Sequence, residues 1–347
     1  GNLRNYENYI DTNSKWDATL DTADLGAMQR PTGVSVSTSA VGLLNLYEYQ
    51  ESYRGTTFYD GYLNNGLSWW TLTPYSANQM RFVYYIGNSY NDSITNNAYG
   101  IRPAINLKAD VKIVSGSGTE SDPYRLNGDN DSNLNGVKLN TRYSGEYISF
   151  GNGENNLYRI VSHENGSGTK ITSVNPLKNS GKFVELAFGN DNFSTTNTIG
   201  NFLNNNYSNP SNGYLTNEQI NMIEESTTWY LGFFGRGINY KLAKYADTTS
   251  DTLTANTTIA KIGLLRVGEL MAGQFDINEN VFDYWAITPS NLGAQKCKLS
   301  AVGVATFYNP TSNTGQGIKP AMNLKENVII KEGTGTKIDP FTIELFS

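Results

Sequence analysis

The feature that most constrains this sequence is a segment that occurs twice. Residues 99–108 read YGIRPAINLK, and residues 316–325 read QGIKPAMNLK. A repeat at this distance is far longer than a solenoid unit of roughly 20 to 50 residues, so the sequence predicts two related domains in tandem. Further blocks recur in the same order: VGLL at 41–44 as IGLL at 262–265, WWTLTP at 69–74 as YWAITP at 284–289, and GSGT at 116–119 as GTGT at 333–336.

Length and composition place the boundary between these domains. The chain has 347 residues, which is enough for about two domains of roughly 150 residues each. The polar run NGDNDSNLNG at residues 127–136 has the composition of a linker. We predict a first module over residues 1–126, a linker over 127–142 and a second, more complete module over 143–347. A longer segment precedes the repeated blocks of the second module, so we expect the native protein to extend upstream of residue 1.

Short apolar runs separated by turn residues indicate many strands and long loops. Residues 146–161 have the pattern of a hairpin around a Gly- and Asn-rich turn, and a third strand is expected at 170–174. Two helices are expected, one over 198–206 and one that Thr216 caps. The repeated Gly-Leu-Leu blocks fit either a helix or a strand. The expected class is α+β, rich in strands.

Charge and cysteine content exclude several classes of function. The formal net charge is −6 and no basic cluster is present, so a nucleic-acid partner is not expected. Because Cys297 is the single cysteine, an internal disulfide framework and a multi-cysteine metal site are excluded. We interpret it as an unpaired, unreactive thiol. No run reaches the roughly 18 apolar residues of a membrane helix. Membrane attachment is expected only through a missing N-terminal segment.

Few residues offer catalytic or metal-binding chemistry. His163 is the sole histidine and lies in a turn-like context, so neither a histidine-based catalytic triad nor a metal pair is expected. The repeated acids Glu48 and Glu269 are the best candidates for carboxylate chemistry, although a structural role is favoured for both. Residues 129–140 resemble a calcium loop but lack its turn glycine and its final glutamate. We therefore predict no catalytic residue, metal or cofactor.

One stretch combines aromatic rings with small polar side chains. Flat rings give apolar contact at little entropic loss, and Asn, Ser and Tyr offer adaptable hydrogen bonds, as in paratopes. The repeated positions Trp70 and Trp285 are expected to be core residues. The predicted ligand-binding residues are non-repeated ones: Tyr75, Tyr84, Tyr85, Asn88, Tyr90 and Asn91.

The motifs WWTLTP at 69–74 and GIRPAINL at 100–107 resemble the signature of a family of uncharacterised bacterial domains. Members are similar to the formylglycine-generating-enzyme branch of the C-type lectin fold, and the following GSGT segment resembles parts of surface and pilin-like proteins of Gram-positive bacteria. The resemblance implies tandem C-type-lectin-like domains in an extracellular protein. The catalytic cysteine pair of the sulfatase-modifying enzymes and the calcium motif of true C-type lectins are both missing. Lys319 also replaces Arg102 in the second copy.

Three hypotheses for the function follow from these observations. The first is a non-enzymatic module on the cell surface or pilus of a Gram-positive bacterium, which binds a glycan or a protein; its closest variant is a structural filament subunit that contacts copies of itself. The second is a carbohydrate-active enzyme that uses paired carboxylates. The third is a hypervariable ligand binder built on the same fold.

Overall fold

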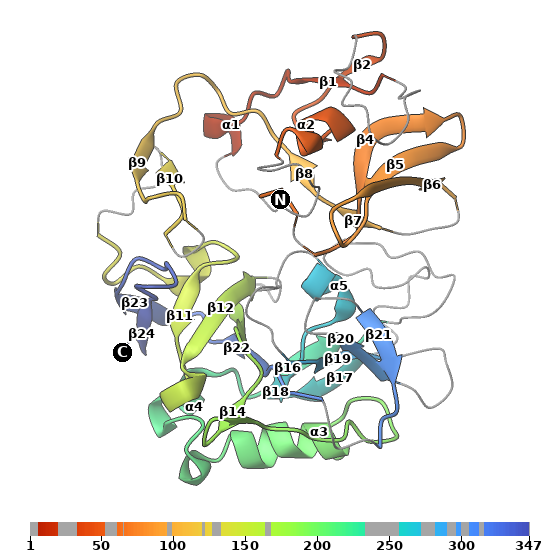
Figure 1. Cartoon of the computed structure of the whole chain (residues 1–347). Helices are drawn as coiled ribbons and strands as arrows, with labels where there is room; N and C mark the ends of the chain where they lie inside the picture. Colours follow the sequence, from red (N-terminus) through yellow and green to blue (C-terminus); the bar gives the residue numbers. More distant parts are fainter. Residues whose placement is uncertain are drawn as a thin grey trace. The chain divides into compact units, whose positions relative to one another are not determined.

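The computed structural model divides the chain into two compact units (Figure 1). Unit 1 comprises Gly1–Ser115 with Arg125–Asp129, and unit 2 comprises Gly116–Tyr124 with Asn130–Ser347. Both are built mainly of β-strands with few helices, which confirms the expectation of a strand-rich chain. The structure describes residues 6–19, 33–52, 61–64, 66–95, 99–119, 122–126, 133–163, 168–232, 257–271, 282–289, 296–299, 305–311 and 316–346.

Unit 1 is organised around a four-stranded sheet in the order β6-β5-β4-β7. Two further strand pairs, β1 with β2 and β3 with β8, and the hairpin of β9 and β10 complete it. One face of the four-stranded sheet and helix α2 bury a small core of Leu46, Tyr49, Trp69 and Val83. The elements are α1 (Tyr6–Tyr9), β1 (Lys15–Asp17), β2 (Val36–Thr38), β3 (Gly42–Leu43), α2 (Leu46–Gln50), β4 (Trp69–Ser76), β5 (Gln79–Val83), β6 (Ser89–Ser93), β7 (Gly100–Ile101), β8 (Pro103–Ala104), β9 (Ile113–Ser115) and β10 (Arg125–Leu126).

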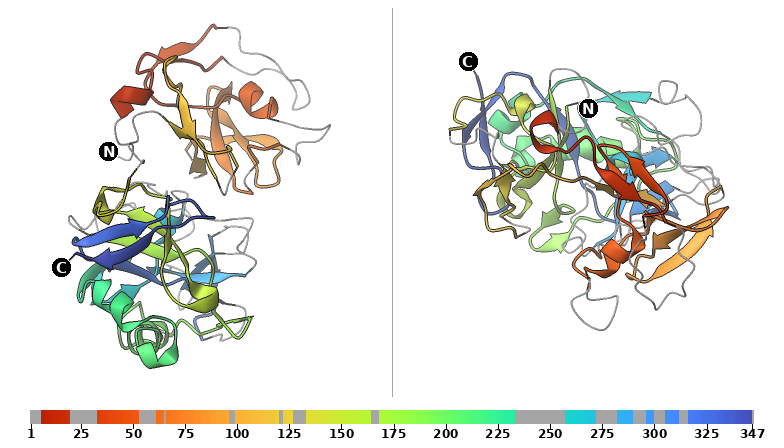
Figure 2. Two further views of the ribbon diagram at one scale, coloured as in Figure 1. Left: turned by 90° about the vertical axis from the view of Figure 1, so that its left-hand side faces the viewer. Right: turned by 90° about the horizontal axis from the view of Figure 1, so that it is seen from above.

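The first half of unit 2 supplies a three-stranded antiparallel meander and a helical segment. Tyr158 on the meander and Tyr207 on the helical segment are both buried, and their hydroxyls form a hydrogen bond. In the left-hand view of Figure 2 the helical segment, coloured green, lies below the strands of unit 2. The elements are η2 (Leu139–Thr141), β11 (Tyr147–Ser149), η3 (Gly153–Asn155), β12 (Leu157–Ser162), β13 (Thr169–Ser173), β14 (Lys178–Asn179), β15 (Lys182–Phe183), α3 (Thr198–Asn201), η4 (Phe202–Tyr207) and η5 (Pro210–Asn212).

The second half of unit 2 closes the main sheet. Its strands β22 and β18 extend the meander to five strands in the order β11-β12-β13-β22-β18, over a large apolar core. The elements are α4 (Asn217–Met222), β16 (Thr227–Tyr230), β17 (Thr257–Ala260), β18 (Ile262–Gly263), α5 (Val267–Met271), β19 (Tyr284–Pro289), β20 (Lys296–Leu299), β21 (Ala305–Tyr308), β22 (Ala321–Leu324), β23 (Val328–Glu332) and β24 (Thr342–Leu345).

The second half of unit 2 repeats the strand pairing of unit 1. The pair β3 and β8 corresponds to β18 and β22, and the antiparallel run β4, β5, β6 corresponds to β19, β20, β21. The parallel contact between Trp69 and Gly100 recurs between Tyr284 and Gly317. Within the described residues, the structural repeat therefore includes these strands as well as the repeated sequence blocks that they contain.

A tryptophan and a glycine extend the repeat to the start of unit 1. The indole of Trp16 donates from Nε1 to the carbonyl of Ser39 at 2.7 Å, and Trp229 donates likewise to Ala260 at 3.0 Å. A side chain at Gly42 would meet the Trp16 ring, just as one at Gly263 would meet the Trp229 ring. Both glycines are therefore required by the packing of an indole against the strand.

The residues that sequence analysis assigns to the end of the linker belong to unit 2. Leu134 and Leu139 are buried in its core, and the amide of Gly136 donates to the carbonyl of Ile330 at 2.8 Å. These apolar contacts fix the chain from residue 133 onward, so the polar composition around Leu134 was a poor guide. Residues 127–132 lie outside the described ranges.

The expected elements of the second module are found. Residues 146–161 form the β11–β12 hairpin, and β13 is the third strand. Residues 198–206 fall in α3 and η4, and Thr216 caps α4 through a hydrogen bond from the amide of Gln219 at 3.1 Å. The Gly-Leu-Leu blocks contain both structures, because each begins as a strand and continues into a helix.

A buried ion pair connects the two halves of unit 2. Lys170 on β13 contacts Glu269 on α5, with 2.5 Å between Nζ and Oε1. The other carboxylate oxygen of Glu269 accepts from the amide of Arg266 at 2.9 Å. Burial alone would raise the pKa of Glu269, but the positive charges of Lys170 and Arg266 and these hydrogen bonds lower it below its ordinary value.

This depressed pKa predicts a pH-dependent stability for unit 2. A carboxyl with a lowered pKa in the folded state stabilises above its unfolded pKa of about 4.3, and that contribution is lost as the pH falls through the folded value. We expect Glu269→Gln to lower the free energy of unfolding at pH 7 by about 3 to 5 kcal/mol, since it leaves Lys170 buried and unpaired. Chemical denaturation of unit 2 at several pH values measures both effects.

The control is Glu225→Gln, because Glu225 forms an ion pair with Lys261 at 2.9 Å but its side chain is 71% exposed. We expect it to change the free energy of unfolding by less than about 1 kcal/mol. Equal losses in the two variants would contradict the assignment of Glu269.

Candidate functional site: an aromatic face on unit 1

The four-stranded sheet of unit 1 has one face turned to its core and one that carries aromatic side chains. Trp69 and Val83 point into the core, and both are almost fully buried. Since successive side chains of a strand point to opposite faces, Trp70, Phe82 and Tyr84 lie on the other side. The pairing of Phe82 with Tyr90 places the neighbouring strand in the same phase.

Six rings on this second face form one connected cluster, which we call the aromatic face. Phe82 lies at its centre, stacked on Tyr99 with 4.1 Å between ring centroids. Trp70 meets Tyr99 edge-on at 4.8 Å, and Tyr84 contacts Tyr85 at 4.4 Å and Tyr90 at 5.6 Å. Offset and edge-on contacts of this kind stabilise one another beyond simple burial. The members are Trp70, Phe82, Tyr84, Tyr85, Tyr90 and Tyr99.

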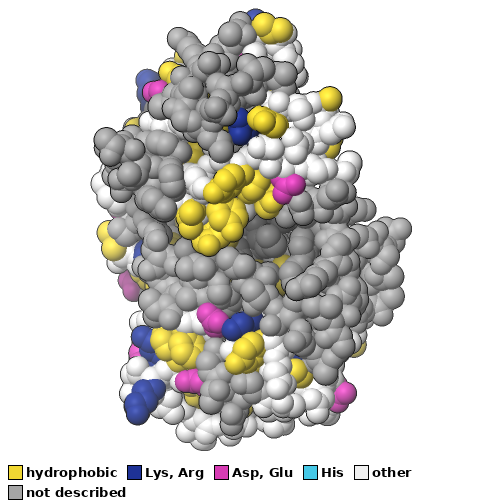
Figure 3. Space-filling model, turned by 45° about the vertical axis from the view of Figure 1, so that its right-hand side comes forward, with side chains coloured by type: hydrophobic (Ala, Val, Ile, Leu, Met, Phe, Trp, Pro, Cys, Tyr) yellow, Lys and Arg dark blue, Asp and Glu magenta, His cyan; other side chains and the backbone are white. Residues whose placement is uncertain are grey.

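The aromatic face is open to solvent at its tyrosines. Phe82 is buried at 5%, but Tyr85 is 41% exposed and Tyr90 43% exposed, and Tyr84 is half-buried. Hydrophobic side chains gather in a patch on unit 1 in the view of Figure 3. The arrangement therefore has a rigid buried centre with accessible rings around it.

A carboxylate provides a polar group at the aromatic face. The hydroxyl of Tyr99 donates to Oδ2 of Asp92 at 2.6 Å. Burial, followed by this hydrogen bond and the negative charge of Asp92, raises the pKa of Tyr99 well above its ordinary value. Burial and the neighbouring tyrosine hydroxyls also raise the pKa of Tyr84. The single proton of the Tyr99 hydroxyl is therefore already used by Asp92, and the carboxylate of Asp92 is the polar group that this pair offers to a ligand.

The six residues predicted from sequence divide between three places. Tyr84, Tyr85 and Tyr90 lie together on the aromatic face. Tyr75 instead packs against Arg81, whose guanidinium carbon lies 4.5 Å from the ring centroid, and Asn91 pairs with Arg81 across the strands, so both lie toward the core side of the sheet. Asn88 is in the turn between β5 and β6.

Sequence reasoning did not select four members of this site: Trp70, Phe82, Tyr99 and Asp92. Trp70 was expected to be a core residue because it is repeated, yet Trp69 is the fully buried member of the pair. The signal that identifies the face is the strand alternation of Phe82 with Tyr84 and of Tyr90 with Asp92. Selecting residues by type alone gave some that lie on the aromatic face and others that lie on the core side of the sheet.

The corresponding face of unit 2 is covered. Trp285, the counterpart of Trp70, is 1% exposed. Its Nε1 donates to the carbonyl of Leu186 at 2.8 Å, and Phe188 meets its ring edge-on at 5.6 Å. Both repeated tryptophans, Trp70 and Trp285, were expected to be core residues. Only Trp285 is one. The open aromatic face is a property of unit 1.

The repeated acids have a local structural role. The Oε2 atom of Glu48 accepts from the amide of Asn45 at 2.8 Å and completes a capping box at the start of α2. Glu269 makes the same contact with the amide of Arg266 in unit 2. This shared role explains the recurrence of the acid without catalysis.

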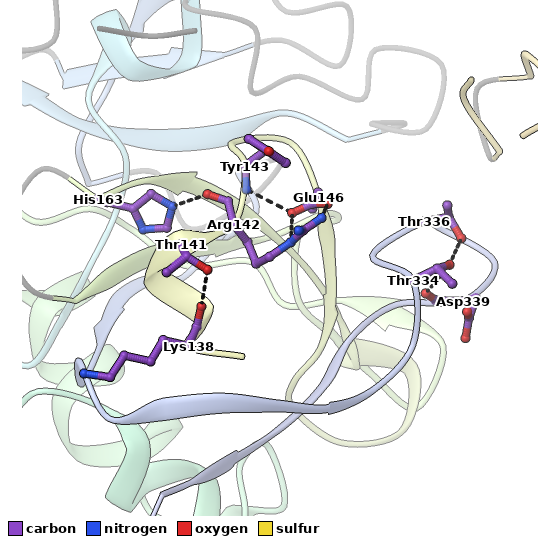
Figure 4. A network of polar contacts seen from close by, with 9 residues as sticks. All are labelled: Lys138, Thr141, Arg142, Tyr143, Glu146, His163, Thr334, Thr336 and Asp339. Atoms are coloured by element: carbon purple, nitrogen blue, oxygen red, sulfur yellow. Dashed lines mark hydrogen bonds and ion pairs between the residues drawn. The ribbon is translucent and has the colours of Figure 1, made fainter. Parts of the chain in front are cut away.

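His163 takes part in a structural network in unit 2 (Figure 4). Its ring is half-buried directly after β12; Nε2 lies 2.7 Å from the carbonyl oxygen of Arg142, and Nδ1 lies 3.2 Å from Oγ1 of Thr169. Arg142 in turn forms an ion pair with Glu146 at 2.5 Å. The histidine therefore joins the start of the meander to β13 rather than standing free in a surface turn.

The remaining candidates offer no further chemistry within the described ranges. There, no three His, Cys, Asp or Glu side chains gather as a metal site would require, and no helix has the length and apolarity needed to cross a membrane. Cys297 is in β20, but its side chain is not described. Asp129 and Asp131 of the calcium-like run lie outside the described residues.

Comparisons with known proteins give one family match. Residues 32–109, which include β2 to β8 and the whole aromatic face, match a family model described as Domain of unknown function (DUF6273). No curated protein and no solved structure gave a significant match. The match is confined to unit 1, and its description assigns no activity.

The central ring of the aromatic face is expected to carry much of the stability of unit 1. Phe82→Ala removes a ring that contacts four others, so we expect it to lower the free energy of unfolding by about 3 to 5 kcal/mol. Ile94→Ala is the control, since Ile94 is 53% exposed and should change stability by less than about 0.5 kcal/mol. Denaturant unfolding measures both; a loss below about 1 kcal/mol for Phe82→Ala would contradict the assignment.

Proposed function

We propose that this chain is a non-enzymatic module of a bacterial cell surface or pilus, and that the aromatic face of unit 1 binds a glycan. The observation that carries the proposal is the connected cluster of rings with three accessible tyrosines. The proposal includes a tandem C-type-lectin-like fold and a Gram-positive source, both of which rest on the resemblance of the repeated motifs. A protein ligand for the same face is the alternative.

The chemistry of the aromatic face favours sugar as the ligand. A pyranose ring has apolar C–H faces that can pack on flat aromatic rings, and its hydroxyls need hydrogen-bond partners around them. Tyr85 and Tyr90 offer accessible rings, and Asp92 offers carboxylate oxygens nearby. The rings are held by one another, so little side-chain entropy is lost on binding.

A second candidate is a structural subunit of an extracellular filament. The observation that favours it is the exposure of apolar side chains outside the aromatic face, among them Ile101 at 55% and Leu107 at 45%. Apolar surface of this kind is commonly buried on assembly. Self-association of the purified chain would support this role.

A glycan array tests the proposal directly. We expect the purified chain to bind a defined set of glycans, and Tyr84→Ala and Tyr85→Ala each to weaken binding by about tenfold or more, since each removes stacking area worth roughly 1.5 kcal/mol. Tyr6→Ala is the matched control, because Tyr6 is 45% exposed but lies on α1. Light scattering records the oligomeric state of each variant.

The outcomes separate the candidates. Specific binding that is lost in the two tyrosine variants and kept in the control supports a glycan-binding face. Absence of glycan binding together with self-association replaces it with the filament role. Glycan binding that survives both variants places the ligand elsewhere on the chain.

A further inference from the structure

The repeated strand segment has opposite surroundings in the two units. In unit 2 its apolar side chains are fully buried, with Ile318, Met322 and Leu324 each at 0% exposure. Their counterparts in unit 1 are exposed: Ile101 at 55%, Ile105 at 38% and Leu107 at 45%. The two copies are similar in sequence, so this difference in exposure indicates that the copy in unit 2 has neighbours that the copy in unit 1 lacks.

One neighbour that only the unit 2 copy has is strand β13 of the same sheet. Strand β22 pairs with β18 along one edge and with β13 along the other, where Ile171 faces Met322 and Lys170 faces Asn323. Strand β8 of unit 1 pairs only with β3. Among the described residues of unit 1, none pairs with the remaining edge of the segment from Pro103 to Leu107.

The hydrogen bonds of the paired edge show which backbone groups belong to the unpaired edge. The carbonyl of Asn106 accepts from the amide of Asp11 at 2.9 Å, and the amide of Lys108 donates to the carbonyl of Tyr9 at 2.8 Å. Consecutive residues of a strand direct their N–H and C=O groups to opposite edges, so Ile105 and Leu107 direct theirs away from β3. We call this the open edge; an unpaired row of this kind is a template for another strand.

Glu48, the counterpart of Glu269 in unit 1, forms no ion pair with the described residues of the chain. In unit 2, Lys170 of β13 reaches Glu269 at 2.5 Å and lies 5.4 Å from the centroid of the Trp229 ring. The counterpart Glu48 makes only its cap contacts and is exposed, and no cation of the described part of unit 1 pairs with it. Unit 1 therefore has the acceptor for a lysine that its own described residues do not supply.

We infer that unit 1 binds an added β-strand, antiparallel to the open edge of β8, with a lysine opposite Asn106 that pairs with Glu48. The occupant of the equivalent edge in unit 2 defines its sequence. A β-branched residue faces Ile105, as Ile171 faces Met322. Strand addition of this kind takes affinity from main-chain hydrogen bonds and specificity from alternate side chains.

A glycine near the start of the strand is a further requirement. In unit 2 a side chain at Gly168 would come within 2.2 Å of the carbonyl oxygen of Leu324. The partner strand therefore needs glycine two positions before its lysine, giving the pattern Gly-x-Lys-β-branched. This inference rests on the repeat and is independent of the glycan proposed for the aromatic face.

A synthetic peptide of residues 157–175, the β12–β13 segment, is a suitable probe for the full-length chain. We expect saturable binding by fluorescence anisotropy, and slower hydrogen exchange at the amides of Ile105 and Leu107. A second arm joins the same peptide to the start of the chain through a Gly/Ser linker, which raises its effective concentration if free binding is weak.

Charge reversal tests the lysine pairing. Glu48→Lys should weaken binding of the natural peptide by about tenfold or more, as loss of a charge-assisted hydrogen bond predicts. A peptide with Lys170→Glu should bind the natural chain as weakly and recover affinity for the Glu48→Lys chain. Glu51→Lys is the control, because Glu51 lies just beyond α2 and should leave binding unchanged.

The outcomes decide the inference. Recovery by the double charge reversal, together with protection at the two amides, supports strand addition at the open edge. No protection in either arm, or binding indifferent to Glu48→Lys, overturns it. Combining Tyr84→Ala with Tyr85→Ala should leave peptide binding intact, so a failure of glycan binding and a failure of strand addition remain distinguishable.

Discussion

Backbone pairing of the repeated strand is the constraint on which both units depend. In each unit this strand accepts a short Gly-containing strand on one side, and the glycine admits an indole that packs behind it. The same short strand leads into a capped helix, whose amide at Leu46 or Val267 donates to a threonine hydroxyl at 2.8 and 3.0 Å. Once this strand is placed, the position of the tryptophan, the helix and the next sheet follow from it.

The two units differ in what meets the other side of that strand. Unit 2 places β11 to β13 there and buries a core that extends from Leu134 to Phe341. The core cluster described for unit 1 is smaller and contains Leu46, Tyr49, Trp69 and Val83, and many other apolar side chains of the unit are exposed. Similar local sequence thus supports either a core strand or an edge strand, because burial is decided by residues that are distant in the chain.

Sequence reasoning predicted the tandem repeat, the strand-rich class, the β11–β12 hairpin and the helix that Thr216 caps, since each has a local signal. It could not predict the different surroundings of Glu48 and Glu269, because the lysine that pairs with Glu269 lies 99 positions earlier, in strand β13. The site was half predicted: residue type selected Tyr84, Tyr85 and Tyr90, but only the strand phase distinguishes them from Tyr75 and Asn91. A β-bulge changes which face of the sheet the following side chains point to, and the register of β4 shifts between Trp70 and Pro74. The sequence alone therefore does not assign Tyr75 to a face.

The long separation between β13 and β22 has a consequence for synthesis of the chain. Ribosomes add roughly 5 to 20 residues per second, and the N-terminal part folds first. When Ile171 leaves the ribosome, its native partner Met322 has not yet been translated, whereas the near-identical strand β8 has. The strand addition inferred for the open edge would therefore give the nascent meander a competing partner before its own partner strand is made. A tandem repeat in this order would in this way place a kinetic competitor ahead of the native partner in the chain.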